Sequence, residues 1–316
     1  MGIQQKVANI LPQKDNVTLF MKKSSIKIEE VIKEILYGLY HDGVFTKKIL
    51  IKGGQAIRIK EDIKHRFSVD IDASVNGEIQ NPADFFVRFK RSLDNRFKRL
   101  ELVIIDFKQV KKPKKPHPDA PSFWTGWLIK FKLLEEKNLN LDKDRQSIMA
   151  LIPDGQASPQ IIVELSEYEY CGKFEKMELS LGGAGPKAIT YWYSTEMLVV
   201  EKIRAICQQH PDYLHRKKPT NRARDFYDIA NLIENKIKDK KFKQFITGCA
   251  QLVDPIFAAK EVDKKIIKKI FDPTFLAEIE KGWPFVLSTI PAQSGGEFSM
   301  YVDILQEFID LIIREF

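Results

Sequence analysis

Two aspartates one residue apart, Asp70 and Asp72, are the residues whose types and spacing most clearly allow chemistry. Successive side chains of a β-strand point to opposite faces, so a D-x-D pair on a strand places both carboxylates on one face. Two neighbouring carboxylates repel each other unless a cation lies between them, and hard divalent ions prefer oxygen ligands. The pair therefore predicts a site for Mg²⁺ or Mn²⁺ with both carboxylates as metal ligands.

A glycine pair, Gly53-Gly54, ends a short apolar stretch upstream of the aspartates. Backbone N–H groups of a glycine turn can approach phosphate oxygens closely. Phosphoryl and nucleotidyl transfer need mainly positioning and positive charge around a phosphorus atom that negative oxygens shield. The glycine pair and the two aspartates together predict this type of reaction.

Three motifs, in this order along the chain, resemble those of the AbiEii/AbiGii nucleotidyltransferase toxin family. The first is the glycine pair followed by R-x-S-x-D-x-D at residues 66–72. The second is E-K-x-x-A at residues 201–205, and the third is R-x-[KR]-D-x-x-D at residues 222–228. The resemblance implies a nucleotidyltransferase with an NTP as substrate and RNA, including tRNA acceptor ends, as the acceptor.

The resemblance also implies roles for single residues in the two later motifs. Lys202 and Arg222 are expected to contact phosphate, and Asp225 to orient a basic residue of the site. Asp225 and Asp228 are three residues apart on a predicted helix and share a face. The alternative for this stretch is an ordinary surface helix with ion pairs.

The predicted nucleotide-binding residues come from all three motifs. Ser68 would alternate onto the strand face of the aspartates, although a plain strand-edge serine is the alternative. Gln55 departs from the family, which usually has Ser or Thr at this position, and its longer amide can still donate a hydrogen bond. The set is Gly53, Gly54, Gln55, Arg66, Ser68, Lys202 and Arg222.

A third carboxylate is expected to complete the site from a neighbouring strand. Glu164 lies in an apolar predicted strand, where burial of a charge is costly without a partner. It could bind the metal ion or take the proton of the acceptor hydroxyl. A solvent-facing position is the alternative, and Asp106 is the competing candidate. The predicted catalytic residues are Asp70, Asp72, Glu164, Lys202 and Asp225.

The elements that must position these residues can be predicted from periodicity and capping signals. An α+β fold is expected, with a nucleotidyltransferase-type mixed β-sheet core and flanking helices over residues 1–193 and a helical domain over 194–316. The helical domain would contribute the Lys202 and Asp225 motifs to the site. Helices are predicted at 26–42, 56–62, 81–98, from Ser194 onward and at 300–316, strands at 48–52, 67–74, 100–110, 125–135 and 159–170, an exposed Pro- and Lys-rich loop at 111–123, and a glycine-rich turn between strands at 181–187.

Composition restricts the class of protein further. The chain has 316 residues and a formal net charge of +8, which permits an anionic partner such as RNA without requiring one. No apolar run is long enough to span a bilayer, and the first residues lack the apolar core of a signal peptide, so a cytoplasmic protein is expected. The three cysteines are far apart and predict no disulfide framework or zinc knuckle.

The predicted function is that of a metal-dependent nucleotidyltransferase, the toxin of a toxin–antitoxin or abortive-infection system. It would transfer NMP from an NTP to RNA, with release of pyrophosphate, and a cognate antitoxin would be its partner. One alternative keeps the reaction but has a small molecule or a protein as acceptor. The other is a catalytically weakened protein that binds nucleotide through a site altered at Gln55 and interacts through its helical domain.

Overall fold

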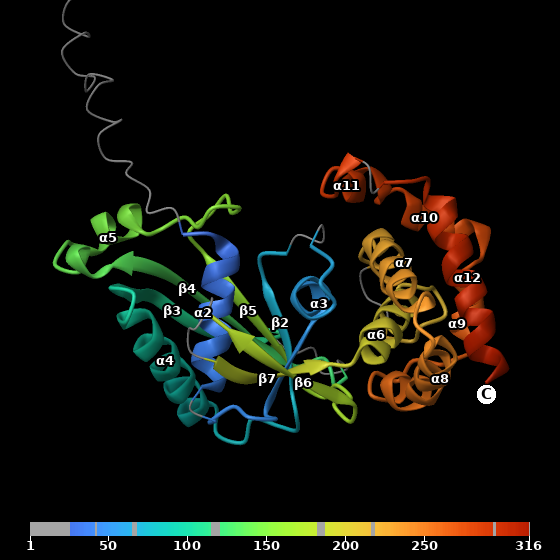
Figure 1. Cartoon of the computed structure of the whole chain (residues 1–316), viewed down its shortest axis with the longest axis horizontal. Helices are drawn as coiled ribbons and strands as arrows, with labels where there is room; N and C mark the ends of the chain where they lie inside the picture. Colours follow the sequence, from blue (N-terminus) through green and yellow to red (C-terminus); the bar gives the residue numbers. More distant parts are fainter. Residues whose placement is uncertain are drawn as a thin grey trace, which may run out of the picture.

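Seven strands form one mixed sheet in the computed structural model, which describes residues 26–41, 43–64, 68–114, 121–181, 187–215, 219–292 and 295–315. Across the sheet the strand order is β3-β4-β5-β2-β1-β7-β6. The helices after the last strand gather beside the sheet (Figure 1). The strands are β1 (Ile49–Lys52), β2 (Ile71–Val75), β3 (Leu102–Lys112), β4 (Gly126–Glu135), β5 (Ile161–Ser166), β6 (Phe174–Ser180) and β7 (Lys187–Tyr193). The expected α+β class is confirmed.

The centre of the sheet joins strands that are distant in the sequence. Strand β2 pairs antiparallel with β1 and parallel with β5, while β1 pairs parallel with β7. The two edges are antiparallel hairpin-like pairs, β3 with β4 and β6 with β7. The central strands β1, β2 and β5 are therefore held in place by neighbours on both sides.

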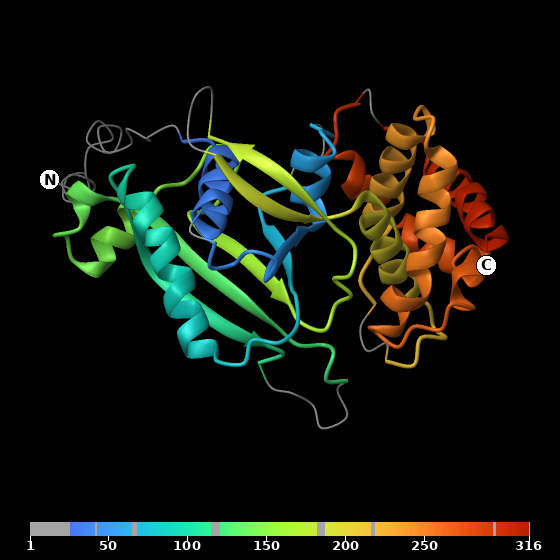
Figure 2. The same cartoon turned by 60° about the horizontal axis from the view of Figure 1, so that its bottom comes forward.

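Two helices pack against the sheet and against each other (Figure 2). In α2 (Ile28–Tyr40), apolar side chains at helical spacing are buried, as the sequence predicts. Asn81 caps α4 (Pro82–Lys98), because its Oδ1 accepts a hydrogen bond from the Asp84 amide at 3.2 Å. Gly38 lets these helices approach closely, since a Cβ there would lie 3.2 Å from the Arg96 Cβ.

The turn after β1 differs from the sequence prediction in where its helix begins. Instead of starting at residue 56, the helix starts at the glycine pair as α3 (Gly53–Gln55) and continues as the π-helix η3 (Ala56–Lys60). Gly53 has a positive φ of 62°, a conformation that glycine adopts without the cost paid by other residues. The chain can therefore turn sharply from β1 into the helix.

The strand predicted at 67–74 is shorter, because β2 begins at Ile71. Asp72 lies on the strand, whereas Asp70 and Ser68 lie on the segment that leads into it. The Gln55 side-chain amide donates to the Ser68 carbonyl at 2.9 Å and to the Asp70 carbonyl at 3.2 Å. These hydrogen bonds hold the segment beside α3 and satisfy carbonyl groups that a longer strand would offer to a neighbour.

Several boundaries in the second half of the core differ from the prediction. Strand β3 continues to Lys112, so Lys111 and Lys112 lie on a strand and not in the predicted loop. Strand β5 ends at Ser166, short of the predicted residue 170. Strands β6 and β7 flank the glycine-rich turn, whose residues 182–186 lie outside the described residues. The short helix α5 (Lys143–Met149) and the 3-10 helix η4 (Glu136–Asn138) were not predicted.

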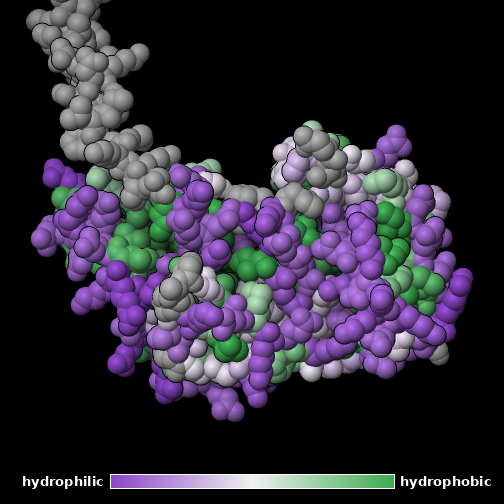
Figure 3. All heavy atoms as spheres, in the orientation of Figure 1, coloured by the Kyte–Doolittle hydropathy of each residue, from purple (hydrophilic) through white to green (hydrophobic). Residues whose placement is uncertain are grey.

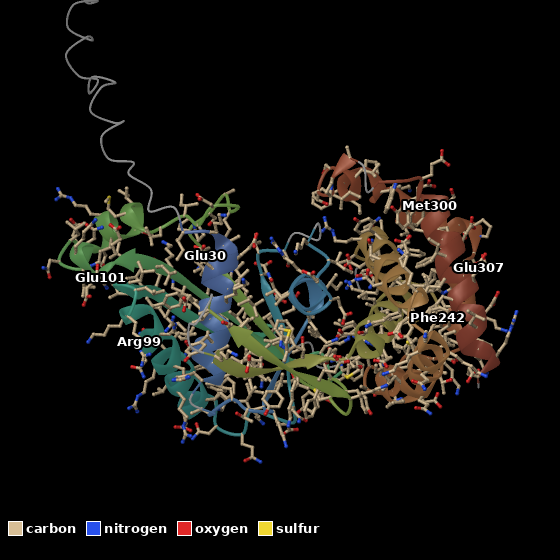
Figure 4. The ribbon with its side chains drawn as sticks, in the orientation of Figure 1. Glu30, Arg99, Glu101, Phe242, Met300 and Glu307 are labelled. Carbon is tan, nitrogen blue, oxygen red and sulfur yellow. The ribbon has the colours of Figure 1, made fainter. Side chains whose placement is uncertain are left out.

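The predicted helical region after residue 194 is confirmed. Ser194 caps α6, since its Oγ accepts a hydrogen bond from the Met197 amide at 3.2 Å. Phe242 and Glu307 mark this helical side in Figure 4, and Glu30 and Arg99 mark the sheet side. The helices are α6 (Thr195–Cys207), α7 (Ala223–Ile237), α8 (Phe242–Ala258), α9 (Ile266–Lys269), α10 (Pro273–Glu280), α11 (Trp283–Leu287) and α12 (Phe298–Arg314).

The two parts share one core. Buried apolar side chains from the sheet side and from the later helices form a single cluster, and the division into domains at residue 194 stays a prediction. Hydrophilic side chains cover most of the face seen in Figure 3. Within the described ranges, no helix combines the length and the apolar character that crossing a membrane would require.

Candidate active site

A row of three charged residues crosses the centre of the sheet. Asp72 on β2 is directly opposite Lys52 on β1 and, on its other side, directly beside Glu164 on β5. Residues paired in this way lie on the same face of a sheet. The register therefore brings the predicted third carboxylate next to the second aspartate of the D-x-D pair.

The competing carboxylate, Asp106, lies elsewhere. It is on the outer strand β3 near an irregularity in the β3–β4 register, with a positive φ of 53°. Its carboxylate pairs with Lys132 at 2.8 Å, and hydrogen bonding to Lys132 lowers its pKa. The geometry thus favours Glu164 over Asp106 as the neighbour of the aspartate pair.

A cleft of about 840 Å³ lies over this row, between the sheet and the helices. The sheet wall includes Asp72, Glu164 and the glycine pair, and the helical wall includes residues from α6 and from the start of α7. Figure 1 shows β2 and α3 on the side of the sheet that faces α6 and α7. The predicted site residues that line the cleft are Gly53, Gly54, Asp72, Glu164, Lys202, Arg222 and Asp225.

The remaining predicted site residues do not line the cleft. Gln55 is buried and its amide is engaged by the carbonyls of Ser68 and Asp70, so its contact with a nucleotide stays a prediction. Asp70 is half-buried just ahead of β2, near enough to Glu164 for the two charges to interact. Arg66 lies outside the described residues.

Lys202 on α6 is held by two carboxylates from α7. Its Nζ lies 2.7 Å from Asp225 Oδ1 and 2.8 Å from Asp228 Oδ2. The side chains of the two aspartates are only 10% and 1% exposed, so this is a nearly buried charge cluster. Asp225 therefore contacts a basic residue on the cleft wall, as its predicted role would require, and that role stays a prediction.

Two arginines extend the helical wall. Arg222, at the N-cap of α7, is 38% exposed and its Nη1 lies 3.5 Å from Asp225 Oδ2. Its Nε is buried and has no hydrogen-bond partner among the described residues. Arg224 also lines the cleft and donates a hydrogen bond to the Thr289 hydroxyl. Guanidinium groups of this kind bind phosphate oxygens well.

A buried charge network joins the sheet to the helices beneath the cleft. Lys52 Nζ lies 2.5 Å from Glu201 and 3.6 Å from Glu169. Arg204 lies 3.5 Å from both glutamates, and Lys260 lies 3.3 Å from Glu169. Lys52, Glu169 and Lys260 were not among the site residues predicted from the sequence, because only the fold brings them together.

The network keeps Glu169 ionised. Burial opposes ionisation of Glu169, but the charges of Lys52, Arg204 and Lys260 lower its pKa to about 2. For Lys52 the balance also favours the charged form, because Glu169 and Glu201 outweigh burial and raise its pKa. Lys52 thus remains a cation directly beside Asp72.

The aspartate pair has the opposite electrostatic character. Burial raises the pKa of Asp72, the charges of Glu164, Asp70 and Glu201 raise it further, and Lys52 opposes them. Burial and the charge of Glu164 likewise raise the pKa of Asp70. Negative charge at these two carboxylates is therefore under-compensated by the protein.

The donor set fits a hard divalent cation, which prefers carboxylate oxygens and would offset this repulsion. Among the described residues, no group of three or more His, Cys, Asp or Glu side chains is arranged to hold a metal ion. In addition, Glu164 pairs with Lys112 at 2.7 Å. Mg²⁺ is commonly held by one or two carboxylates together with substrate phosphates and water, which two aspartates can provide.

Comparison with known proteins identifies the class. The family model of the nucleotidyl transferase AbiEii toxin of type IV toxin–antitoxin systems matches residues 34–298. The chain belongs to this family and is a nucleotidyltransferase, as the three motifs predict.

Two further comparisons add little. A crystal structure of an antigenic nucleotidyltransferase-like protein from Paracoccidioides brasiliensis is similar at 14% sequence identity. The match has a TM-score of 0.36 and covers 76% of this chain and 96% of that chain. No match was found among curated proteins.

Proposed function

We propose that the chain uses Mg²⁺ or Mn²⁺ to transfer NMP from an NTP to RNA, with tRNA as the expected acceptor, and that it acts as a toxin in this way. A cognate antitoxin is the expected partner, and the cytoplasm, where tRNA is found, is the expected location. One observation carries the proposal. The under-compensated carboxylates of Asp72 and, just ahead of β2, Asp70 lie on the sheet side with Glu164 beside Asp72, and Lys202 and Arg222 lie on the opposite wall of the cleft.

The reaction joins the acceptor hydroxyl to the α-phosphorus of the NTP. The new P–O bond forms as the bond to the bridging oxygen breaks, and pyrophosphate leaves with the electron pair. Asp70 and Asp72, with Glu164 as the third candidate, would hold the metal ion, which would neutralise charge on the phosphate oxygens when bound. Carboxylates on one wall of the cleft and cations on the other suit a reaction in which a triphosphate binds together with a metal ion.

Lys202 and Arg222 are the cations that would bind the triphosphate. Asp225 and Asp228 hold the Lys202 side chain in place before the substrate binds, so little free energy is needed to order it on binding. Arg222 is partly exposed on the same wall, with a buried Nε that lacks a partner among the described residues. Both side chains can contact phosphate oxygens while the carboxylates act at the opposite wall.

Proton transfer requires a base near the acceptor hydroxyl. Glu164 is the candidate, because it is adjacent to Asp72 and lines the cleft. Its carboxylate pairs with Lys112 at 2.7 Å, and both residues line the cleft. The net charge of +8 favours a polyanionic acceptor over a small neutral one.

The test is to incubate the purified protein with total tRNA, Mg²⁺ and each α-labelled NTP in turn. Label on RNA, lost in Asp72→Asn and after chelation of the metal, is the expected result. Pyrophosphate release without labelled RNA would contradict the RNA acceptor and direct the search to small molecules and proteins. Full activity in the chelator would contradict the metal requirement.

A further inference from the structure

An exposed phenylalanine lies on the helical wall of the cleft. Phe285 on α11 is 71% exposed, although burying such a ring is worth about 1.5–3 kcal/mol. Twelve large hydrophobic residues are exposed in the described part of the chain, and Phe285 is the one among them that lines the cleft. A single exposed apolar side chain is ordinary on a surface. Whether Phe285 has a role therefore depends on how rigidly α11 is held and on which residues lie beside the ring.

The helix that carries Phe285 is tied at its start to the beginning of α7. Asn221 accepts a hydrogen bond from the Ala223 amide at 2.9 Å and donates one to the Ile279 carbonyl at 2.7 Å. Gly282, just before α11, packs on this side chain, since a Cβ there would lie 2.0 Å from Asn221 Oδ1. Position 282 therefore has no room for a side chain, and α11 begins against Asn221.

The other end of α11 is tied to the same turn of α7. Arg224 donates a hydrogen bond to the hydroxyl of Thr289, two residues past the end of α11. Between these two attachments, Trp283 is buried and its Nε1 donates to the Gly296 carbonyl at 3.0 Å. The Trp283 ring packs against Tyr301, with ring centroids 4.8 Å apart. The ring of Phe285 thus projects from a fixed support.

The same turn of α7 carries Arg222, so the support presents an aromatic ring and a guanidinium group to one cleft. Aromatic rings stack on nucleobases of any sequence, and guanidinium groups bind the phosphates attached to them. We propose that Phe285 is the stacking platform for a nucleobase in this cleft, next to a phosphate held by Arg222. This inference rests on the proposed function, which supplies two sources of the base: the NTP and the end of the acceptor RNA.

Binding measurements on three variants test the role of the ring. Phe285→Ala removes the side chain, Phe285→Leu keeps an apolar side chain without an aromatic face, and Phe285→Trp keeps the face. Base–aromatic stacking has a typical strength that corresponds to roughly a 5- to 150-fold change in affinity. We expect the Ala and Leu variants to bind one ligand that much more weakly and the Trp variant to retain binding.

The ligands are fluorescein-labelled tRNA, followed by anisotropy, and each of the four NTPs, followed by calorimetry, all without turnover. Leu287→Ala is the matched control, because Leu287 is an exposed residue of α11 that does not line the cleft. Circular dichroism and thermal melting of every variant verify folding. Weakened NTP binding assigns the base to the NTP, and weakened tRNA binding assigns it to the acceptor.

Two results would overturn the inference and separate it from the proposed function. If the wild-type protein binds NTP or tRNA and all Phe285 variants bind equally well, the stacking platform is wrong and the proposed function is untouched. If the Leu variant binds as well as wild type while the Ala variant does not, the side chain provides apolar contact only, which also contradicts stacking. If the wild-type protein binds none of the ligands, both the inference and the proposed function fail.

Discussion

The carboxylate of Asp72 packs directly on the backbone of Gly53. A Cβ built on Gly53 would lie 2.4 Å from Asp72 Oδ2 and 2.9 Å from Asp72 Cβ, far inside contact distance. Gly53 also has a positive φ of 62°. The first glycine of the pair is thus required twice, once for the turn into α3 and once to leave space for the central carboxylate of the site.

Gly53→Ala should therefore inactivate the enzyme as well as destabilise it. The left-handed backbone alone costs roughly 1–2 kcal/mol for an alanine, and the clash must in addition displace Asp72. Gly77→Ala is the matched control, because Gly77 has a φ of 76° but open space around it, and a Cβ there would come no closer than 3.9 Å, to Lys48 Nζ. Urea unfolding and nucleotide transfer are measured for both. Equal loss of activity in the two variants would contradict the role of the clash.

Asp72→Asn should remove activity but raise stability at neutral pH in the absence of divalent ions. Because the pKa of Asp72 is raised by burial, the folded protein binds its proton more tightly than the unfolded chain. The stability that this group contributes is present below the unfolded pKa and is lost as pH rises through the folded pKa. Thermal melts should show the largest advantage of the variant at neutral pH and none in acid. An advantage that does not change with pH would exclude this electrostatic cause.

Lys202→Met should be strongly destabilising, because it leaves Asp225 and Asp228 without their shared cation in a nearly buried site. Removing one partner of a buried ion pair typically costs about 3–5 kcal/mol. The measurement is the free energy of unfolding in urea. Lys281→Met is the control, since Lys281 pairs with Glu278 on the surface and should change stability by less than about 0.5 kcal/mol. A Lys202 variant as stable as this control would contradict the cluster.

Gln55→Ala should separate two roles for this residue. If the amide acts by holding the carbonyls of Ser68 and Asp70, kcat should fall by up to about 100-fold as Asp70 shifts, while KM for the NTP changes little. A direct phosphate contact would instead raise KM for the NTP. Steady-state kinetics over a range of NTP concentrations distinguish the two results. Gln80→Ala, at an exposed position, should leave both constants unchanged.

The sequence was most informative where chemistry requires fixed spacing. The glycine pair, the D-x-D pair and the two later motifs identified six of the predicted site residues that line the cleft, because these patterns can be recognised without knowledge of the fold. Glu164 was found by a different signal, a carboxylate inside an apolar strand. Its place beside Asp72 follows from the parallel pairing of β2 with β5, which the sequence does not specify.

Other features depend on contacts between distant segments. Lys52 looks like an ordinary strand-end lysine until β1 is brought beside Glu169 and Glu201. The sequence predicts a turn between strands at 181–187 but no bounds for β6, because its Glu and Lys residues are types that are depleted in strands. Asp70 was placed on β2, but Gln55 takes the carbonyls that would have continued the strand, and only tertiary structure reveals this contact.

The order of the strands has a consequence for synthesis of the protein. On the sheet wall, strand β1 pairs with β7, and on the helical wall Lys202 pairs with Asp225 and Asp228. Each wall of the cleft therefore needs segments that are synthesised late. A growing chain that has made Asp70 and Asp72 still lacks the opposite wall. The site can therefore assemble only after β7 and the start of α7 have been synthesised.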